Sequence, residues 1–387
     1  MSMDVGSAEM GMDEWCRRVP KVELHAHLNG SIRDSTLLEL ARERSKKGDL
    51  VLSDVEGVIL KDDRSLQECF KLFDLIHVLT TDHGTISRIT KEVIEDFAAE
   101  NVIYLELRTT PKKNEAIGMS KRSYVEAVLA GFKAVETVEA IYLPSDGSIQ
   151  FPGEVVQQNN VCRGSRMHQI FVRLLLSIDR RDSLDGAMET VQLALEMRNT
   201  GVVGIDLSGN PVVGHWQTFL PALTWARKQG LPITLHCGEV PNRQEIQGML
   251  KFHPERLGHV CCLEDLEWKT LKESDIPVEV CLTSNVRTEC VTSIADHHFA
   301  DLYRVKHPLI LCTDDPGVFS TTISREYALA ASCFDLTKME LFQLAKHAVN
   351  FIFADNKMKE TLRLIIEETE CNLLMPHEHV ENSVSPK

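Results

Sequence analysis

The sequence predicts an α/β protein whose eight parallel strands close into a (β/α)8 barrel of the TIM type. Short apolar runs alternate along the chain with stretches of helical periodicity, and this alternation implies a parallel sheet with right-handed crossovers. Eight such runs can be counted, which is the number that closes a barrel. An open, doubly wound sheet is the alternative, although no GxGxxG motif follows the first strand.

The first half of the chain holds two predicted strands and the extra helices. Alternating apolar residues predict a strand at 22–28, and an apolar run predicts the second at 102–107. Leucine, phenylalanine and isoleucine at helical spacing predict helices at 31–47, 66–79, 87–100 and 120–137.

The second half of the chain is more regular. Apolar runs predict strands at 170–178, 202–207, 233–235, 257–261, 278–282 and 309–312. Most are separated by one helical stretch, for example 184–198 and 218–229, and a helical extension is expected at 337–374. We therefore expect one barrel domain over 13–376, between disordered tails at 1–12 and 377–387. A segment rich in Gly, Ser, Asn and Gln at about 144–167 is interpreted as an insertion.

Composition limits the classes of function. The chain has 387 residues, 43% of them hydrophobic, which is enough for a large core. Its net charge of -15 argues against general nucleic-acid or membrane binding, so an anionic substrate would need a local basic patch. Eleven cysteines without CxxC pairs indicate reduced thiols of a cytosolic protein. The N-terminus does not resemble a signal peptide, and no apolar run reaches membrane-spanning length.

A His-Ala-His motif closes the first predicted strand. Side chains two residues apart on a strand share a face, so His25 and His27 should project together, just before Asn29. Two such imidazoles can bind one divalent metal ion, although a lone HxH motif is also compatible with ordinary hydrogen-bonded histidines.

Polar residues follow all eight apolar runs at corresponding points. In such barrels the catalytic groups gather at the C-terminal ends of the strands, so these residues are expected to form one site. They are His25 and His27, Arg108 to Thr110, Asp179, Ser208 to Asn210, His236 with Glu239, His259, Thr283 to Asn285, and Asp314 with Asp315.

Four of these residues form a candidate metal-binding set. His25, His27, His236 and Asp314 offer three nitrogens and a carboxylate, which suits zinc with a position left for water. Cys237 has the opposite parity to His236 and should face the helices. The alternative for Asp314 is a plain Asp-Pro-Gly turn.

Zinc lowers the pKa of bound water to about 7, so a proton donor and a base or orienting group are needed nearby. Glu239, His259 and Asp315 are the candidates. Each also has a structural interpretation: Glu239 as a glutamate at the start of a helix, His259 as a core histidine and Asp315 as a helix cap.

Other titratable residues are given structural interpretations. Glu23 shares the parity of the two histidines and is expected one layer deeper, paired with a base. His297, His298 and His307 are interpreted as surface or capping groups.

Six motifs between residues 19 and about 330 resemble the adenosine and AMP deaminase family, and they occur in its order. They are KVELHAHLNGS, SGNP, HCGE, RLGH, LTSN and CTDDPGVF. LELRTTPK, LLLSIDRR and the short N-terminus resemble the adenosine deaminase-like branch, which removes methylamine from N6-methyl-AMP. The resemblance implies a (β/α)8 barrel with one zinc ion, held by the four residues named above.

The resemblance also implies roles for the other residues. Glu239 would protonate purine N1, His259 would orient or deprotonate the water, and Asp315 would help to hold it. The backbone N–H of Gly209 would reach purine N3. The nucleotide pocket would be lined by His27, Asn29, His77, Thr109, Thr110, Pro111, Lys112, Asp179 and Asp315. Arg108 and Lys112 would supply positive charge for a phosphate, and Val260 stands where a smaller residue is expected.

The sequence therefore predicts a zinc-dependent hydrolase that deaminates a purine nucleotide at C6, with N6-methyl-AMP as first choice. Adenosine or AMP is the runner-up substrate. A non-catalytic binding protein and another metal-dependent amidohydrolase, for which two metal ions per chain would be diagnostic, are the alternatives. The expected partner is a small-molecule nucleotide, with no nucleic-acid polymer or membrane, and a monomer is compatible with the sequence.

Overall fold

The computed structural model describes residues 10–141 and 169–374. The predicted insertion at 144–167 and the predicted tail at 377–387 lie outside these residues. The predicted N-terminal tail at 1–12 overlaps the described chain, because helix α1 (Met12–Arg18) begins at Met12. The Nζ of Lys338 also donates to the carbonyl oxygen of Met10, at 2.6 Å.

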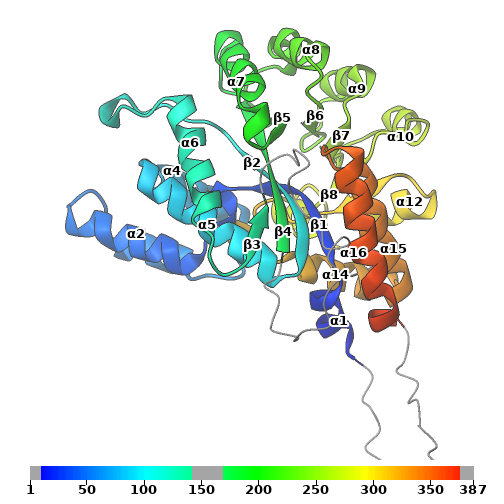
Figure 1. Cartoon of the computed structure of the whole chain (residues 1–387). Coiled ribbons are helices and arrows are strands. Elements are labelled where there is room, and N and C mark those ends of the chain that lie inside the picture. The colour runs from blue at the N-terminus through cyan, green and yellow to red at the C-terminus, as the bar shows by residue number, and fades with distance from the viewer. Residues whose placement is uncertain (1–9, 142–168, 375–387) are drawn as a thin grey trace, which may run out of the picture.

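Eight parallel strands form a nearly closed barrel surrounded by helices (Figure 1). In order around the sheet they are β1 (Lys21–His27), β2 (Val102–Thr109), β4 (Gln169–Asp179), β5 (Val202–Ser208), β6 (Ile233–Cys237), β7 (Arg256–His259), β8 (Val278–Val280) and β9 (Leu309–Leu311). Each overlaps a predicted strand, so the (β/α)8 prediction is confirmed. A short strand β3 (Glu139–Ile141), which was not predicted, pairs with β4.

The seventh strand was predicted to extend further at its C-terminal end than it does in the structure. It was expected to reach residue 282, but β8 stops at Val280 and helix α11 (Leu282–Arg287) begins two residues later. The side chain and backbone N–H of Thr283 donate to buried Glu326, which explains the early turn. The LTSN motif therefore lies on a helix rather than on a strand.

Helices cover the outside of the barrel, as the apolar stripes of the sequence predict. Between β1 and β2 lie α2 (Asp34–Lys46), α3 (Ser53–Ile59), α4 (Leu66–Leu79) and α5 (His83–Ala99). The strands that follow are connected by α6 (Lys121–Lys133), α7 (Leu184–Glu196), α8 (Leu220–Lys228), α9 (Arg243–Phe252), α10 (Asp265–Lys272) and α12 (Phe299–Arg304). After β9 come α13 (Pro316–Phe319), α14 (Ile323–Phe334), α15 (Lys338–Ala348) and α16 (Asn356–Leu374). Within residues 10–141 and 169–374, no helix has both the length and the apolar character that crossing a bilayer requires.

Strand β1 and the segment after β9 close the barrel. Ala26 and Asp314 form a parallel bridge, in which the N–H of His27 donates to the carbonyl of Asp314 at 2.9 Å. The N–H of Asp314 donates to the carbonyl of His25 at 2.7 Å. The closure therefore places Asp314 directly beside the His-Ala-His motif, although nearly 290 residues separate them.

Glu23 takes part in the same closure. Its carboxylate accepts from the N–H and the hydroxyl of Thr313, at 3.0 and 2.8 Å, and from the N–H of His25 at 2.7 Å. Burial raises the pKa of Glu23 to about 8. The prediction that Glu23 pairs with a base is wrong, because its partners are backbone N–H groups and a hydroxyl.

Candidate active site

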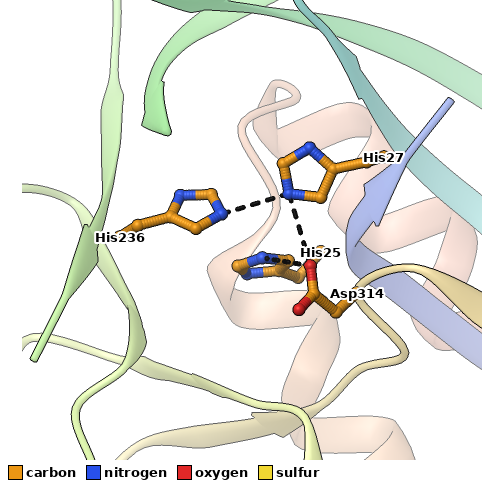
Figure 2. Close-up of side chains that lie close together, drawn as sticks. All are labelled: His25, His27, His236 and Asp314. Carbon is orange, nitrogen blue, oxygen red and sulfur yellow. Dashed lines mark hydrogen bonds and ion pairs between the residues drawn. The ribbon is translucent and has the colours of Figure 1, made fainter. Parts of the chain in front are cut away.

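The four predicted metal ligands converge at the C-terminal end of the barrel (Figure 2). Their candidate ligand atoms all lie within 4.8 Å of one another. The Nε2 atoms of His27 and His236 are 3.1 Å apart. Asp314 Oδ1 lies 3.4 Å from Nε2 of His27 and 3.3 Å from Nε2 of His25. Strands β1 and β6 and the segment after β9 contribute these side chains.

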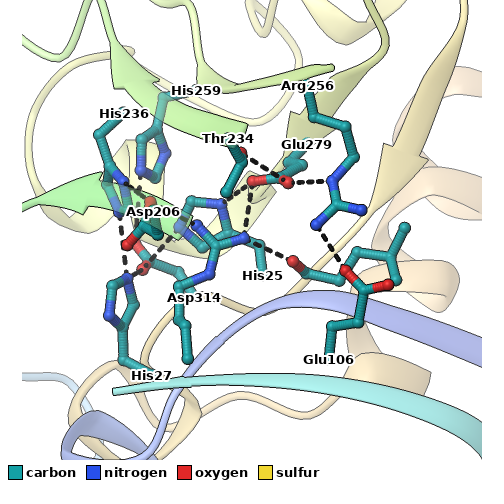
Figure 3. A network of polar contacts seen from close by, with 12 residues as sticks. His25, His27, Glu106, Asp206, Thr234, His236, Arg256, His259, Glu279 and Asp314 are labelled. Atoms are coloured by element: carbon teal, nitrogen blue, oxygen red, sulfur yellow. Dashed lines mark hydrogen bonds and ion pairs between the residues drawn. The ribbon is translucent and has the colours of Figure 1, made fainter. Parts of the chain in front are cut away.

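Two of the histidines are oriented by buried carboxylates (Figure 3). His25 Nδ1 bonds to Glu279 Oε2 at 2.6 Å, and His236 Nδ1 bonds to Asp206 Oδ1 at 3.0 Å. A carboxylate partner holds the proton on Nδ1, which leaves the Nε2 lone pair for a metal ion. His25 Nε2 is buried and makes no hydrogen bond of regular geometry among the described residues, and it faces Asp314 Oδ1 at 3.3 Å. The arrangement fits a divalent metal ion.

A charged network fills the barrel beneath these ligands. Arg108 pairs with Asp206 at 3.2 Å and with Glu279 at 2.9 Å, while Arg256 pairs with Glu279 at 2.6 Å and with Glu106 at 2.7 Å. All five side chains are fully buried. Each arginine lies between two carboxylates, which compensates the cost of burying its charge.

Arg108 therefore cannot supply charge to a substrate phosphate. The resemblance suggested that role, but the guanidinium points into the barrel and is committed to Asp206 and Glu279. Its parity on β2 is the reason, because Arg108 alternates with Thr109, whose hydroxyl bonds to Tyr124 on the covering helix α6.

Two polar side chains lie beside the candidate metal cluster. His259 Nε2 is 3.9 Å from Glu239 Oε1 and 3.9 Å from Asp314 Oδ2. Burial raises the pKa of Glu239 to about 7, so this carboxyl can hold a proton near neutral pH. Glu239 is therefore suited to be a proton donor.

Asp315 follows the ligand Asp314 and packs against the turn after β1. A Cβ atom built at Gly30 would lie only 1.6 Å from Asp315 Oδ1, so the glycine is needed to make room for this carboxylate. Burial, together with the neighbouring Asp314, raises the pKa of Asp315 well above its usual value.

A second group of charged residues, which we call the rim cluster, consists of His77, Lys112, Asp179 and Arg181. Lys112 Nζ bonds to His77 Nδ1 at 3.0 Å, and Arg181 Nε bonds to Asp179 Oδ1 at 3.0 Å. Burial and then Arg181 lower the pKa of Lys112 to about 8, and burial and then Lys112 lower the pKa of His77 to about 4. Two cations beside one carboxylate give a local excess of positive charge.

The remaining predicted pocket residues lie near the ends of β1, β2 and β5. Asn29 Oδ1 is buried and has no hydrogen-bond partner within the described part of the chain, so it can accept from a ligand. Thr109 Oγ1 is bonded to Tyr124 at 2.8 Å, and Thr110 and Pro111 lead from β2 to Lys112. Gly209 has a φ of +104°, and a Cβ there would lie 3.0 Å from Asp179 Oδ1.

Sequence reasoning missed several residues that support the site. Asp206 and Glu279 orient two of the candidate ligands. Ser284, which was expected at the site, donates its Oγ to Asp314 Oδ2 at 2.6 Å. An acidic residue inside an apolar strand, at inward parity, is the signal that could have identified Asp206 in GIDLS and Glu279 in VEV.

Three histidines were interpreted as surface or capping groups, and the surface part of that interpretation is wrong. The capping part holds for His297, whose Nδ1 accepts from the N–H of Phe299 at the start of α12. His297, His298 and His307 are all buried, with at most 8% of each residue exposed. His307 Nε2 bonds to the carbonyl of Ile276 at 2.9 Å. His298 bonds to the carbonyl of His259, and His297 bonds to Asn285, which in turn bonds to the ring of His259.

Comparison with known proteins agrees with this geometry. The family described as adenosine deaminase matches residues 20–369. An Arabidopsis thaliana protein named N6-mAMP deaminase is 60% identical over 354 residues, which is 92% of this chain and 98% of that protein. The Mus musculus protein named N6-Methyl-AMP deaminase is 41% identical over 373 residues, covering 93% and 95%. The crystal structure of Arabidopsis ADAL complexed with IMP has a TM-score of 0.85 and 58% identity, covering 93% of this chain and all of that one.

Proposed function

The chain belongs to the adenosine deaminase family, and on this premise we propose that it hydrolyses N6-methyl-AMP to IMP and methylamine. One observation carries the proposal. Three imidazole nitrogens and the Asp314 carboxylate converge within 4.8 Å, beside a half-buried glutamate and a buried histidine. The names of the relatives favour a methylated adenine nucleotide over AMP or adenosine.

We propose zinc as the metal ion. His25, His27, His236 and Asp314 would hold it, because three imidazoles and one carboxylate form a typical zinc ligand set. When bound, zinc supplies a water whose pKa is lowered to about 7 and which is therefore a nucleophile at neutral pH.

The protein's own residues then act on the purine and on the attacking water. Protonated Glu239 would deliver its proton to purine N1, which makes C6 electrophilic. His259 and Asp315 would hold the water in line with C6. Addition of water gives a tetrahedral carbon, and loss of methylamine from it leaves the 6-oxo group of IMP.

Glycine allows the purine to approach the backbone closely. With a φ of +104°, which disfavours any residue other than glycine, and with Asp179 Oδ1 only 3.0 Å from the place of a Cβ, a side chain at residue 209 would be strained and crowded. Its N–H would then be available to purine N3.

The rim cluster is proposed to hold the 5'-phosphate. Lys112 and Arg181 are the cations, and Thr110 lies two residues before Lys112. Because the chain carries a net charge of -15, a phosphate needs such a local excess of positive charge. The solved relatives bound to IMP and GMP carry ligands that have this phosphate.

We also propose a cytosolic location and a small-molecule nucleotide as the only ligand class. The ten cysteines of the described residues are free thiols, which suits a reducing compartment.

Turnover of N6-methyl-AMP, AMP and adenosine tests the proposal. We expect N6-methyl-AMP to have the highest kcat/KM, with methylamine and IMP as products. The Glu239→Gln variant should lose turnover and still bind zinc, because the amide keeps the shape but has no acidic proton. Equal rates on the three substrates would overturn the substrate assignment, and full activity of Glu239→Gln would overturn the role of Glu239.

A further inference from the structure

His259 is the last member of a chain of buried hydrogen bonds that begins outside the active site. The N–H of Phe299 donates to His297 Nδ1 at 3.0 Å. His297 Nε2 bonds to Asn285 Oδ1 at 3.1 Å, and Asn285 Nδ2 bonds to His259 Nδ1 at 2.9 Å. His259, Asn285 and His297 are each no more than 2% exposed.

The backbone N–H of Phe299 fixes the donor and the acceptor of every hydrogen bond in this series. A backbone N–H can only donate, so His297 Nδ1 must present a lone pair, and the single proton of the neutral ring is on Nε2. That proton is donated to Asn285 Oδ1. The amide NH2 of Asn285 therefore faces His259 and donates to its Nδ1.

The opposite orientation of the Asn285 amide is excluded by the same contacts. It would place the NH2 group against the Nε2–H of His297, so that two donors would face each other. Burial, with a further contribution from His298, lowers the pKa of His297 to about 2, so this ring is neutral.

The backbone of His259 is held from the same segment. His298 Nε2 donates to the carbonyl of His259 at 2.7 Å, and the rings of His297 and His298 stack with centroids 4.2 Å apart. This support has a clear purpose, because His259 and Val260 have φ of +66° and +53°, which side-chain-bearing residues rarely adopt. Two consecutive histidines thus hold the ring and the backbone of one active-site residue.

We infer that Asn285 and His297 are positioning residues that keep the proton of His259 on Nε2, where it points into the active site. Nε2 is buried, has no hydrogen-bond partner among the described residues, and lies 3.9 Å from both Glu239 Oε1 and Asp314 Oδ2. The inference deepens the proposed function and rests on it for its catalytic meaning.

This tautomer decides between the two roles that the sequence left open for His259. An imidazole whose Nδ1 accepts a hydrogen bond and whose Nε2 bears the proton donates to the attacking oxygen. It orients that oxygen and stabilises the negative charge that develops on it. The proton of the water then goes to a carboxylate, and Asp315 is the remaining base candidate from the sequence, because Glu239 is assigned as the acid.

The Asn285→Asp variant tests the inference with almost no change of shape. A carboxylate can only accept, so it would accept from His297 Nε2 and from His259 Nδ1, which moves a proton of His259 onto Nδ1. We would label the zinc-loaded full-length protein with 15N-histidine, assign His259 by its loss in His259→Gln, and record which ring nitrogen is protonated. His307→Gln is the matched control, since His307 is a buried histidine bonded to a backbone carbonyl outside the chain of contacts.

In the wild type we expect the proton on Nε2 and a bare Nδ1. In Asn285→Asp we expect Nδ1 to be protonated and kcat to fall about 10–100-fold with a smaller change in KM. His297→Phe should lower kcat in the same direction, and His307→Gln should change neither quantity. A wild-type His259 with its proton on Nδ1, or an Asn285→Asp variant with unchanged tautomer and kcat, would overturn the inference. The spectrum does not depend on turnover, so failure of the proposed substrate would be recognised separately.

Discussion

At the scale of single residues, burial sets the chemistry of the site. Glu239 is an ordinary carboxyl group whose pKa rises to about 7 chiefly because it is removed from water. The nearby His236 acts in the opposite direction, and Asp314 adds to the rise. A carboxyl group of this kind is still partly protonated at neutral pH, as a proton donor to purine N1 must be.

The pH dependence of turnover should follow Glu239. A raised pKa means that the required protonated form is lost as pH increases through about 7, so kcat/KM should decline tenfold per pH unit well above that value. Steady-state rates on N6-methyl-AMP between pH 6 and 9 measure this, with circular dichroism at each pH to show that the fold is retained. A flat profile over this range would contradict the assignment of Glu239 as the acid.

At the scale of elements, neighbouring strands supply the support that one strand cannot give to its own ligand. His236 on β6 is oriented by Asp206 on β5, and His25 on β1 by Glu279 on β8. Burial would raise the pKa of Asp206, but its interactions with His236 and with the Arg108 guanidinium hold that pKa below its ordinary value. The acid therefore stays ionised and keeps the proton of His236 on Nδ1.

Replacing Asp206 with asparagine should weaken metal binding. An amide is a poorer acceptor for His236 Nδ1–H, and loss of such a partner typically costs 10–100-fold in metal affinity. Arg108 also loses a charged partner, so the free energy of unfolding should fall by about 3 kcal/mol.

Competition with a zinc chelator and chemical denaturation measure the two effects of Asp206→Asn. Asp63→Asn is the control, because that side chain is 82% exposed and the substitution makes the same chemical change. Unchanged zinc affinity in Asp206→Asn would show that Asp206 does not orient the ligand.

At the scale of the whole molecule, the metal site joins the two ends of the barrel. Its candidate ligands come from β1, from β6 and from the segment after β9, and the Ala26–Asp314 bridge brings the first and last of these together. A metal ion bound there links segments that an unfolded chain would hold far apart. It should therefore stabilise the folded state as well as serve the reaction.

Removal of the metal ion should lower the melting temperature and abolish turnover together. With free zinc at 100 times its Kd, the bound state is stabilised by about 2.7 kcal/mol, which a chelator would remove and added zinc would restore. Thermal unfolding with and without chelator measures this, and His27→Ala should show little response to either reagent.

The metal content of the purified protein distinguishes the deaminase from a different metal-dependent amidohydrolase. One zinc ion per chain agrees with the deaminase, whereas two would favour a different metal-dependent amidohydrolase. A melting temperature that is insensitive to chelator in a fully active enzyme would contradict the metal site itself.

The sequence alone predicted the barrel and the four residues that converge at its mouth. Eight apolar runs and the polar residues after them were enough to predict the strands, and parity along β1 was enough to place His25 and His27 on one face. Both properties are local, because strand periodicity and the position of a residue at a strand end depend only on nearby residues. The strong family motifs lie at these same strand ends.

Only the tertiary structure decided how the polar residues are paired. Arg108 was expected to face a phosphate and instead lies between Asp206 and Glu279, while the buried His297 reaches His259 through Asn285. Lys112 and Arg181, by contrast, come together in the rim cluster although they follow different strands. The sequence states which side chains can ionise or donate, but their partners belong to other strands and loops. Those partners are fixed only when the barrel closes and water is excluded from its interior.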